Sequence, residues 1–394
     1  MKFFIIAGEA SGDMHAAKLI AQLQSQQTNT HFVGMGGDKM QASGCQLLQH
    51  YREMAFMGVI AVLANLTKIR NNFKIAKEGL LQHKPDVLIL VDYPSFNLKI
   101  AKFCKTHLPD TKIFYYIPPK IWAWKTWRVH QIAKYCDEVW GIFPFEPDFY
   151  ARYGYSCRYV GNPTFDALTE WKNIHFPKGY GIQQRKEIIA ILPGSRKSEI
   201  THCLPKMLQA ARMVAAQYPN MQIHVAQAPG ISPELYQQYV QDETLRNDTY
   251  ELLSQAKVAV VNSGTATLEA AILECPQTAV YHIACSKWVM WLKPILFKIP
   301  HFTLVNIIAR REVIRELIAI DFTVANIVNE LEQLLNDTVY VVTSLPAALE
   351  SVNEQGGGIV RCDVLFTEAE GVFAAVSYDL VYGDTLYSSA FSQD

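Results

Sequence analysis

The sequence has little net charge, no paired cysteine motif and no long apolar run. Its 36 Lys and Arg residues nearly balance its 37 Asp and Glu residues, for a formal net charge of −1. A dedicated nucleic-acid binder carries a broad positive field, so we expect no nucleic-acid partner. The eight cysteines are scattered without a C-x-x-C pair. That pattern excludes the usual zinc and disulfide frameworks and is typical of reduced cytoplasmic thiols.

A membrane-spanning segment is also lacking. A spanning helix needs roughly 18 or more consecutive apolar residues, and no run in the chain approaches that length. The first apolar run, residues 3–7, stops at Gly8-Glu9, which is far too early for a signal peptide core. We therefore expect a cytoplasmic protein that touches a membrane only peripherally.

Two short apolar runs end in glycine-bearing loops that open helices. Residues 3–7 lead into Gly8–Asp13, and residues 188–192 lead into Pro193–Arg196. Glycines let the backbone approach a ligand, and a helix N-terminus supplies free N–H groups and a positive dipole end. One such unit at the start of each half predicts two Rossmann-like domains facing across a cleft. This layout suits an enzyme that handles a nucleotide-linked substrate.

Apolar runs alternate with helical segments through both halves. The pattern predicts strands at 3–7, 31–33, 87–91, 112–117, 139–142, 159–160, 188–192, 222–226, 258–261 and 278–281. Unbroken apolar strands are typical of parallel sheets buried on both faces, so the predicted fold class is α/β. The polar, aperiodic stretch at about 165–185 predicts a linker. We expect domains at 1–165 and 166–345, and a tail at 346–394 that the pattern does not assign.

Six motifs carry a resemblance to a known family. In chain order they are Ile5–Asp13, Asp92–Asn97, Pro119–Trp124, Val160–Pro163, Leu192–Arg196 and Ser263–Glu269. Together they closely resemble lipid-A-disaccharide synthase, a glycosyltransferase family of Gram-negative outer-membrane biogenesis. The resemblance implies a GT-B architecture. It also implies that UDP-2,3-diacylglucosamine is joined to lipid X (2,3-diacylglucosamine 1-phosphate), giving UDP and a β-1,6-linked disaccharide.

Two features depart from the family pattern. Where the family has Ala-Gly-Arg-Glu, residues 309–312 read Ala-Arg-Arg-Glu, with Arg310 in place of the glycine. The segment after Leu349 also lacks the family's helical, alanine-bearing ending. Family C-terminal helices return to the N-terminal domain, and domain-swapped dimers occur. For this chain, a returning tail and a homodimer both stay open.

The predicted UDP site lies in the second half and relies on protein donors. GT-A enzymes hold a metal with Asp-x-Asp, which occurs nowhere in the chain, so we expect neither a metal nor another cofactor. Arg196 follows the strand at 188–192 and can donate bidentately to phosphate oxygens. Ser263, Gly264 and Thr265 open a second helix at a strand end, another N-terminus suited to phosphate.

The resemblance adds two residues to this site. It implies that Glu269 binds the ribose hydroxyls and that Asn306 approaches the diphosphate. Taken without the resemblance, Ser263 is more often an N-cap and Glu269 an ordinary first-turn acid. Because all six motifs occur together in the order of the family, we favour a nucleotide-binding role for both residues over these structural roles.

The predicted acceptor site lies in the first half, at the carboxyl end of the strand at 87–91. Asp92 follows this strand directly, and ligand chemistry in open α/β sheets gathers at that edge. Its carboxylate is our candidate general base for the attacking sugar hydroxyl. The alternative is a turn-forming aspartate before Tyr93-Pro94, which is the more frequent role of an isolated Asp-x-Pro.

The first glycine loop supplies the remaining candidates. Ser11 and Gly12 are predicted ligand-binding residues, with Asp13 as a further acidic candidate beside them. His15, one helical turn after Ser11, is the alternate base or orients the acceptor. A lone histidine near a helix start is more often structural or solvated, and that alternative stays open.

Three segments indicate contact with lipid. Residues 120–128 and 286–298 interleave tryptophan with cations, a combination that favours the headgroup region of a bilayer. Residues 54–63 are apolar on all sides and predict an acyl-chain groove. Core packing is the alternative for all three. Together with the resemblance, they place the protein peripherally on the cytoplasmic face of the inner membrane.

Two other function classes stay open. One is a different sugar-nucleotide enzyme of similar architecture, such as a UDP-N-acetylglucosamine 2-epimerase or a transferase with a polyisoprenoid-linked acceptor. The segment at 120–128 and the Asp92 loop favour the disaccharide synthase over it. The other class is a redox or non-catalytic dinucleotide-binding protein. Its G-x-G-x-x-G fingerprint is absent from the first loop, where Gly8 and Gly12 have no glycine between them.

Overall fold

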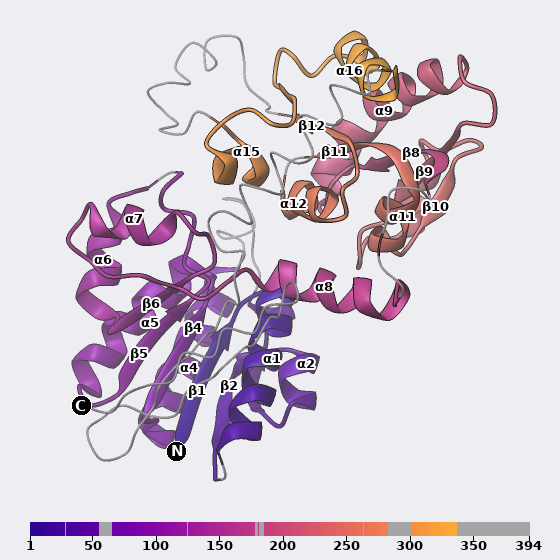
Figure 1. The fold of residues 1–394 in the computed structure, drawn as a ribbon. Helices are drawn as coiled ribbons and strands as arrows, with labels where there is room; N and C mark the ends of the chain where they lie inside the picture. The colour runs from indigo at the N-terminus through magenta and orange to yellow at the C-terminus, as the bar shows by residue number, and fades with distance from the viewer. Residues whose placement is uncertain are drawn as a thin grey trace. The chain divides into compact units, whose positions relative to one another are not determined.

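The computed structural model describes residues 1–27, 29–54, 65–123, 125–177, 180, 185–262, 264–282 and 301–336. The described chain forms two compact units, one up to Pro163 and the other from Thr164 onward (Figure 1). Each unit is an α/β layered structure around its own parallel sheet. The predicted tail at 346–394 lies outside the described residues.

The first unit is built on a seven-stranded parallel sheet in the order β3-β2-β1-β4-β5-β6-β7. The strands are β1 (Lys2–Ala7), β2 (His31–Gly36), β3 (Gln46–His50), β4 (Val87–Val91), β5 (Lys112–Tyr116), β6 (Glu138–Gly141) and β7 (Arg158–Tyr159). The described helices are α1 (Ala10–Gln26), α2 (Asp38–Ala42), α4 (Leu66–His83), α5 (Pro94–His107), α6 (Arg128–Tyr135) and α7 (Glu146–Ala151), with a 3-10 turn at η1 (Tyr51–Glu53). The strand order reverses between β1 and β4, which is the switch point where such sheets bind ligands.

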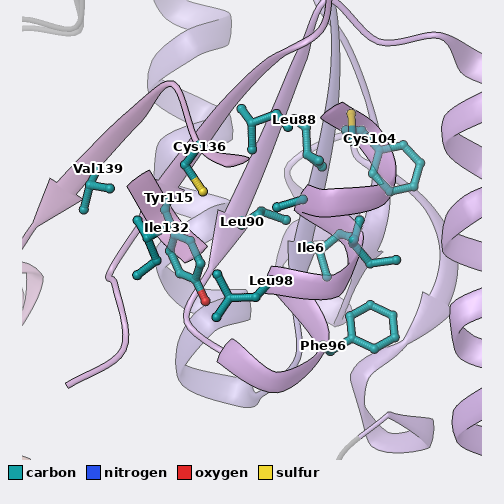
Figure 2. Close-up of a cluster of buried hydrophobic side chains, with 14 of the residues drawn as sticks. Ile6, Leu88, Leu90, Phe96, Leu98, Cys104, Tyr115, Ile132, Cys136 and Val139 are labelled. Atoms are coloured by element: carbon teal, nitrogen blue, oxygen red, sulfur yellow. The ribbon is translucent and has the colours of Figure 1, made fainter. Parts of the chain in front are cut away.

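The core of this unit follows from the alternation of side chains along each strand. Phe4 and Ile6 of β1 point to the face covered by α4, α5 and α6, whereas Phe3 and Ile5 point to the face covered by α1. Figure 2 shows the first cluster, in which Ile6 lies with side chains of β4, β5 and α5. Helices therefore cover both faces, as the unbroken apolar strands predict.

The second unit repeats the plan with a six-stranded parallel sheet in the order β10-β9-β8-β11-β12-β13. The strands are β8 (Lys186–Leu192), β9 (Gln222–Ala226), β10 (Thr244–Arg246), β11 (Ala256–Asn262), β12 (Gln277–Tyr281) and β13 (Glu316–Ile318). The described helices are α8 (Pro163–His175), α9 (Lys197–Ala215), α10 (Pro233–Gln237), α11 (Thr249–Gln255), α12 (Thr265–Ile272), α15 (Leu304–Ala309) and α16 (Val324–Asn336). Here the switch point lies between β8 and β11.

The fold class is confirmed, and each predicted strand is present. Three strands were not predicted: β3, β10 and β13, each at or near a sheet edge. Their sequences QLLQH, TLR and ELI carry polar residues because edge strands are only half covered, so no unbroken apolar run marks them. The prediction of a linker at 165–185 was wrong for its first part, since α8 extends to His175. The apolar residues of α8 have only a weak helical periodicity, so the sequence pattern did not predict this helix.

Candidate functional site

The chain turns sharply at the carboxyl end of β4. Asp92 and Tyr93 have φ angles of 45° and 47°, in the left-handed region that residues other than glycine rarely adopt. Two side chains hold this turn through the Asp92 carbonyl oxygen. The Asn97 amide donates to it at 2.7 Å, and the Tyr115 hydroxyl donates to it at 2.7 Å. These two bonds fix the backbone at Asp92. They do not involve its carboxyl group, and Asp92 lines a pocket.

Gly8 allows the loops after β1 and β4 to meet. A Cβ atom placed on Gly8 would lie 2.3 Å from Cγ of Tyr93, so only glycine fits. The Tyr93 hydroxyl in turn donates to the Met54 carbonyl at 2.6 Å. This glycine was predicted to let the backbone approach a ligand, but the structure shows that it admits the Tyr93 ring.

The electrostatic surroundings of Asp92 suit a base. Burial raises the pKa of Asp92 to about 6, and the nearby Glu9 carboxylate adds to the rise. The backbone N–H of Tyr93 and the Lys120 ammonium act in the opposite direction. A carboxyl with this pKa is mostly ionised at neutral pH, yet it accepts a proton more readily than an ordinary aspartate.

His15 is the weaker of the two candidate bases. Burial lowers the pKa of His15 to about 4, and the positive charges of Lys18 and Lys39 lower it further. Its Nδ1 atom is buried without a hydrogen-bond partner among the described residues. The imidazole is therefore neutral at physiological pH and less basic than Asp92, which leaves Asp92 as the better base.

The other candidates of the first loop divide between surface and core. Ser11 is exposed at the start of α1 and can reach a ligand. Gly12 is buried, and a Cβ atom there would lie 3.4 Å from Cβ of Ala7, so this residue packs α1 against the sheet. Asp13 is structural: its buried carboxylate accepts hydrogen bonds of 2.7, 3.1 and 3.0 Å from the backbone N–H groups of Gly37, Lys39 and Met40.

A pocket of 250 Å³ lies beside Asp92. Segments following β4, β5 and β6 build it, so it occupies the carboxyl edge of the sheet where the sequence predicts the acceptor site. Part of the lining is apolar, including Pro119, Ile121 and Phe143. Three basic side chains complete it, those of Lys120, Lys125 and Arg128.

The segment at 120–128 contains residues of the core, of the pocket lining and of the surface. Trp122 is buried, with its ring edge-on to Phe143 and Phe145 at centroid distances of 5.9 and 5.0 Å. Trp127 is 56% exposed. For Trp122 the core alternative holds, and Trp124 lies outside the described residues.

Glu146 is a functional candidate that was not predicted from the sequence. Its fully buried carboxyl accepts hydrogen bonds from the N–H groups of Ile142 and Phe143 at 2.8 and 2.9 Å, and from the Trp122 indole at 3.3 Å. Burial nevertheless raises the pKa of Glu146 to about 7. The carboxyl positions the pocket wall at 142–143, and the available signal was an acid shortly after the strand at 139–142.

In the second unit, two of the predicted loops lie side by side. Leu192 of β8 pairs with Val261 of β11, so the loops that follow them share one edge of the sheet. The Asn262 amide donates to the Pro193 carbonyl at 3.2 Å across the two loops. Gly194, at φ 117°, allows this approach, because a Cβ atom there would lie 2.6 Å from Nδ2 of Asn262.

The start of α12 is open. A Cβ atom on Gly264 would meet nothing within 4 Å in the described structure, and Thr265 is exposed. The first N–H groups of a helix have no partner within it, which is the feature that phosphate sites use. Ser263 lies outside the described residues.

Arg196 begins α9 and is tied to Glu199. The backbone N–H groups of Ser195 and Arg196 donate to Glu199 Oε2 at 3.0 and 3.2 Å, and the Arg196 guanidinium donates to Oε1 at 2.6 Å. The Arg196 side chain is still 57% exposed. Since a guanidinium has five N–H donors, this ion pair leaves others for a phosphate.

Glu269 lies on α12, where its carboxyl group is largely shielded from water. Burial raises the pKa of Glu269 to about 7. Desolvation is the sole cause of this rise, so no donor or cation among the described residues offsets it. A carboxyl in this state gains from hydroxyl donors such as those of a ribose.

Asn306 has a different role from the predicted diphosphate contact. Its amide donates to the Ile314 carbonyl at 2.8 Å and to Glu316 at 2.9 Å, and its Oδ1 accepts from the N–H groups of Val313 and Ile314 at 2.8 and 3.0 Å. These four bonds use the full capacity of a primary amide. We therefore correct the prediction: Asn306 positions the segment between α15 and β13.

Arg310 occupies the position where the family pattern has glycine. It ends α15 with φ 55°, a left-handed C-cap conformation that favours glycine. The backbone of this chain therefore adopts at Arg310 a conformation that suits the glycine of the family pattern.

The described residues contain neither a metal-binding cluster nor a membrane-spanning helix. No three His, Cys, Asp or Glu side chains there gather closely enough to hold a metal ion. No helix in the same part of the chain has the length and apolar character needed to cross a bilayer. The predicted lipid segment at 286–298 and residues 55–63 lie outside the described residues.

Comparisons of sequence identify relatives over most of the chain. A family model described as lipid-A-disaccharide synthetase matches residues 3–353. The lipid-A-disaccharide synthase of Myxococcus xanthus is 35% identical over 339 residues, which cover 84% of this chain and 88% of that protein. The one of Trichlorobacter lovleyi is 34% identical over 363 residues, covering 91% and 94%.

Comparisons of structure identify the same fold in more distant proteins. A complex described as S. aureus MnaA-UDP matches with a TM-score of 0.58 at 12% identity, over 90% of this chain and 95% of that chain. UDP-GlcNAc 2-epimerase from Neisseria meningitidis matches with a TM-score of 0.54 at 12% identity, over 90% and 99%. Likeness at this identity shows the fold alone, whereas the sequence relatives show the family. The chain belongs to the lipid-A-disaccharide synthetase family and is a hexosyltransferase with a GT-B fold.

Proposed function

We propose that the protein transfers 2,3-diacylglucosamine from UDP-2,3-diacylglucosamine to the 6-hydroxyl of lipid X. The products are the β-1,6-linked disaccharide and UDP. One observation carries this proposal beyond the family. Asp92, with a pKa raised to about 6, lines a sugar-sized pocket at the carboxyl ends of β4, β5 and β6.

The reaction is a single displacement with Asp92 as general base. The acceptor's primary hydroxyl attacks the anomeric carbon of the donor while its proton passes to the Asp92 carboxylate. The bond from that carbon to the UDP oxygen breaks on the opposite face, so an α donor gives a β product. One base suffices, and no covalent enzyme intermediate is needed.

The leaving UDP carries the negative charge that develops in this step. The N–H groups at the start of α12, at Gly264 and Thr265, and the exposed guanidinium of Arg196 are the proposed donors to its diphosphate. Glu269 accepts hydrogen bonds from the ribose hydroxyls, which compensate its desolvated carboxylate. We propose that these donors replace a divalent metal, because the chain lacks Asp-x-Asp.

We also propose that the enzyme works at a membrane surface. Both proposed substrates carry acyl chains that stay in the bilayer while their sugars react. Trp127 and Leu66, which are 56% and 50% exposed, are apolar groups available for such contact in the first unit.

One assay tests the proposed reaction. Purified protein is incubated with UDP-2,3-diacylglucosamine and lipid X, with and without EDTA, and both UDP release and disaccharide formation are followed. We expect disaccharide in equal amounts with and without EDTA. Absence of disaccharide overturns the function, and loss of activity in EDTA that magnesium restores overturns the metal-free mechanism. Conversion of UDP-N-acetylglucosamine alone would favour an epimerase.

A further inference from the structure

The turn at the end of β4 is short and strained. β4 ends at Val91 and α5 begins at Pro94, so only Asp92 and Tyr93 connect them. Both connecting residues have left-handed φ angles, which cost free energy in non-glycine residues and persist only where the surrounding structure enforces them. In α/β enzymes a sharp strand-to-helix turn of this kind can expose a functional side chain at the edge of the sheet.

Asn97 supports this turn from the start of α5. Its side chain is fully buried. The amide group donates to the Asp92 carbonyl at 2.7 Å and to the Val91 carbonyl at 3.2 Å. Helical side chains lean toward the N-terminus of their helix, which carries this amide back to the two carbonyls. Both bonds are therefore made to the backbone that carries the Asp92 carboxyl.

Tyr115 supports the same carbonyl from the neighbouring strand. It lies on β5, where its Cα is paired with that of Leu90 on β4. The ring lies among the apolar side chains of the first core cluster (Figure 2), and its hydroxyl donates to the Asp92 carbonyl at 2.7 Å. Because this bond forms inside an apolar cluster, little water competes for it, and the carbonyl is held in one orientation.

Neither supporting side chain is placed to react. The bonds of Asn97 and Tyr115 go to main-chain oxygens, and neither residue is part of the pocket lining beside Asp92. Any effect on the reaction therefore passes through the position of the Asp92 carboxyl. That position matters because a general base has to lie within hydrogen-bond reach of the proton that it removes. It also matters because burial at this place is the main cause that raises the pKa of Asp92.

We propose that Asn97 and Tyr115 are positioning residues, which hold the strained turn so that the Asp92 carboxyl keeps its place in the pocket. This inference rests on the proposed function, because it gives both residues a part in the action of the base. The orientation of the Asp92 carbonyl fixes the peptide plane between Asp92 and Tyr93, and with it the left-handed conformation of both residues. Loss of either donor lets the turn relax and moves the carboxyl.

The kinetic test compares two buried tyrosines of the same core cluster. Tyr115→Phe removes the hydroxyl that donates to Asp92. Tyr150→Phe is the matched control, because Tyr150 is fully buried and its hydroxyl has no hydrogen-bond partner among the described residues. Asn97→Ala removes both amide donors at once. For each variant, kcat and KM for lipid X are measured from about pH 4 to about pH 8, with thermal unfolding as the check of folding.

Tyr115→Phe should lower kcat by roughly 3- to 10-fold, as expected for one hydrogen bond, and Asn97→Ala by roughly 10- to 100-fold. KM for lipid X should change little, since neither residue is part of the pocket lining. The rise of kcat/KM near pH 6 should move to lower pH, because a carboxyl that leaves its buried place titrates more like an ordinary aspartate. Tyr150→Phe should keep the wild-type kcat and midpoint.

A purely structural role predicts a different result. The charges that act on Asp92, those of Glu9 and Lys120, are the same in all variants, so a moved midpoint reports the place of the carboxyl. A variant that only folds less well would lose activity equally at every pH and keep the wild-type midpoint. That result, wild-type kinetics in Tyr115→Phe, or an equal loss in Tyr150→Phe would overturn the proposal.

A titration that needs no turnover decides the inference even if disaccharide does not form. The protein is labelled with ¹³C at the aspartate carboxyl carbon, and the NMR signal of Asp92 is assigned by its absence from Asp92→Asn. We expect Asp92 to titrate near pH 6 in wild type and in Tyr150→Phe, and at lower pH in Tyr115→Phe. The same midpoint in all three proteins would refute the positioning role. A moved midpoint without any disaccharide would support that role and reject only the proposed reaction.

Discussion

The backbone at the end of β4 in the first unit is strained and closely packed. The loops after β8 and β11 in the second unit are packed less closely. Asp92 and Tyr93 adopt left-handed conformations, and Gly8 leaves no room for a Cβ atom beside them. By contrast, Gly264 borders open space and Arg196 is largely exposed. Both places lie at the switch point of a parallel sheet.

This difference matches the tasks proposed for the two units. A general base must stay within hydrogen-bond reach of one proton, so its backbone is constrained. A diphosphate contacts several donors over a wider surface, and an accessible helix start and a surface arginine suffice for it. Substitutions can therefore separate the turnover of the first site from the affinity of the second.

Asp92→Asn should have the largest effect. It removes the base but keeps the shape, so kcat should fall by about 10²–10⁴-fold, the usual contribution of general-base catalysis. UDP affinity, measured by calorimetry, should be unchanged because the proposed donor residues are in the second unit. A variant with near-normal turnover would remove Asp92 from this role, and His15→Ala would be the next to measure.

Arg196→Ala should have the opposite signature. Charge-assisted hydrogen bonds contribute roughly 1.5–3 kcal/mol, so UDP affinity should weaken by roughly 10- to 100-fold. Glu199→Gln tests whether the ion pair with Arg196 matters by itself, and it should change UDP affinity less. If Arg196→Ala binds UDP as wild type does, the arginine is only a helix cap.

Gly8→Ala and Gly264→Ala compare the packing of the two places directly. At Gly8 the new methyl group meets the Tyr93 ring, and overpacking of this kind lowers the free energy of unfolding by about 1–3 kcal/mol. At Gly264, where φ is 168° and the space is open, the change should be within about 0.5 kcal/mol. Urea unfolding of both variants measures this, and equal losses would contradict the described packing.

Arg310→Gly should have a small effect, and a favourable one. A left-handed conformation costs a non-glycine residue roughly 1–2 kcal/mol, part of which is offset by the greater backbone entropy of glycine when unfolded. Thermal unfolding should therefore show a gain of up to about 1 kcal/mol. A loss of stability would mean that the arginine side chain makes a contact worth more than the strain.

The sequence predicts the sheets and both site edges, but not how the side chains are used. Unbroken apolar runs mark the central strands because both their faces are buried, and the residues after them fall at the site edges. Edge strands such as β13 carry no such run. The place of the candidate sites in the fold could therefore be predicted from short apolar runs and the residues that follow them.

What could not be predicted depends on contacts between distant parts of the chain. Gly8 meets a ring from Tyr93, and the partners of Asp13 lie on another helix. Asn306 is used internally only because the chain after α15 folds back over it. The buried Glu146 depends likewise on the packing of Trp122. One sequence shows these polar residues but not their partners.

The pH dependence of kcat/KM tests the role of Asp92 most directly. The base must be ionised to accept the proton, so kcat/KM for the acceptor, which reports the free enzyme, should rise as pH passes through about 6 and level off above it. Asp92→Asn should show a low rate without that rise. A wild-type profile that is flat between pH 5 and 7, or the same rise in Asp92→Asn, would contradict general-base catalysis by Asp92.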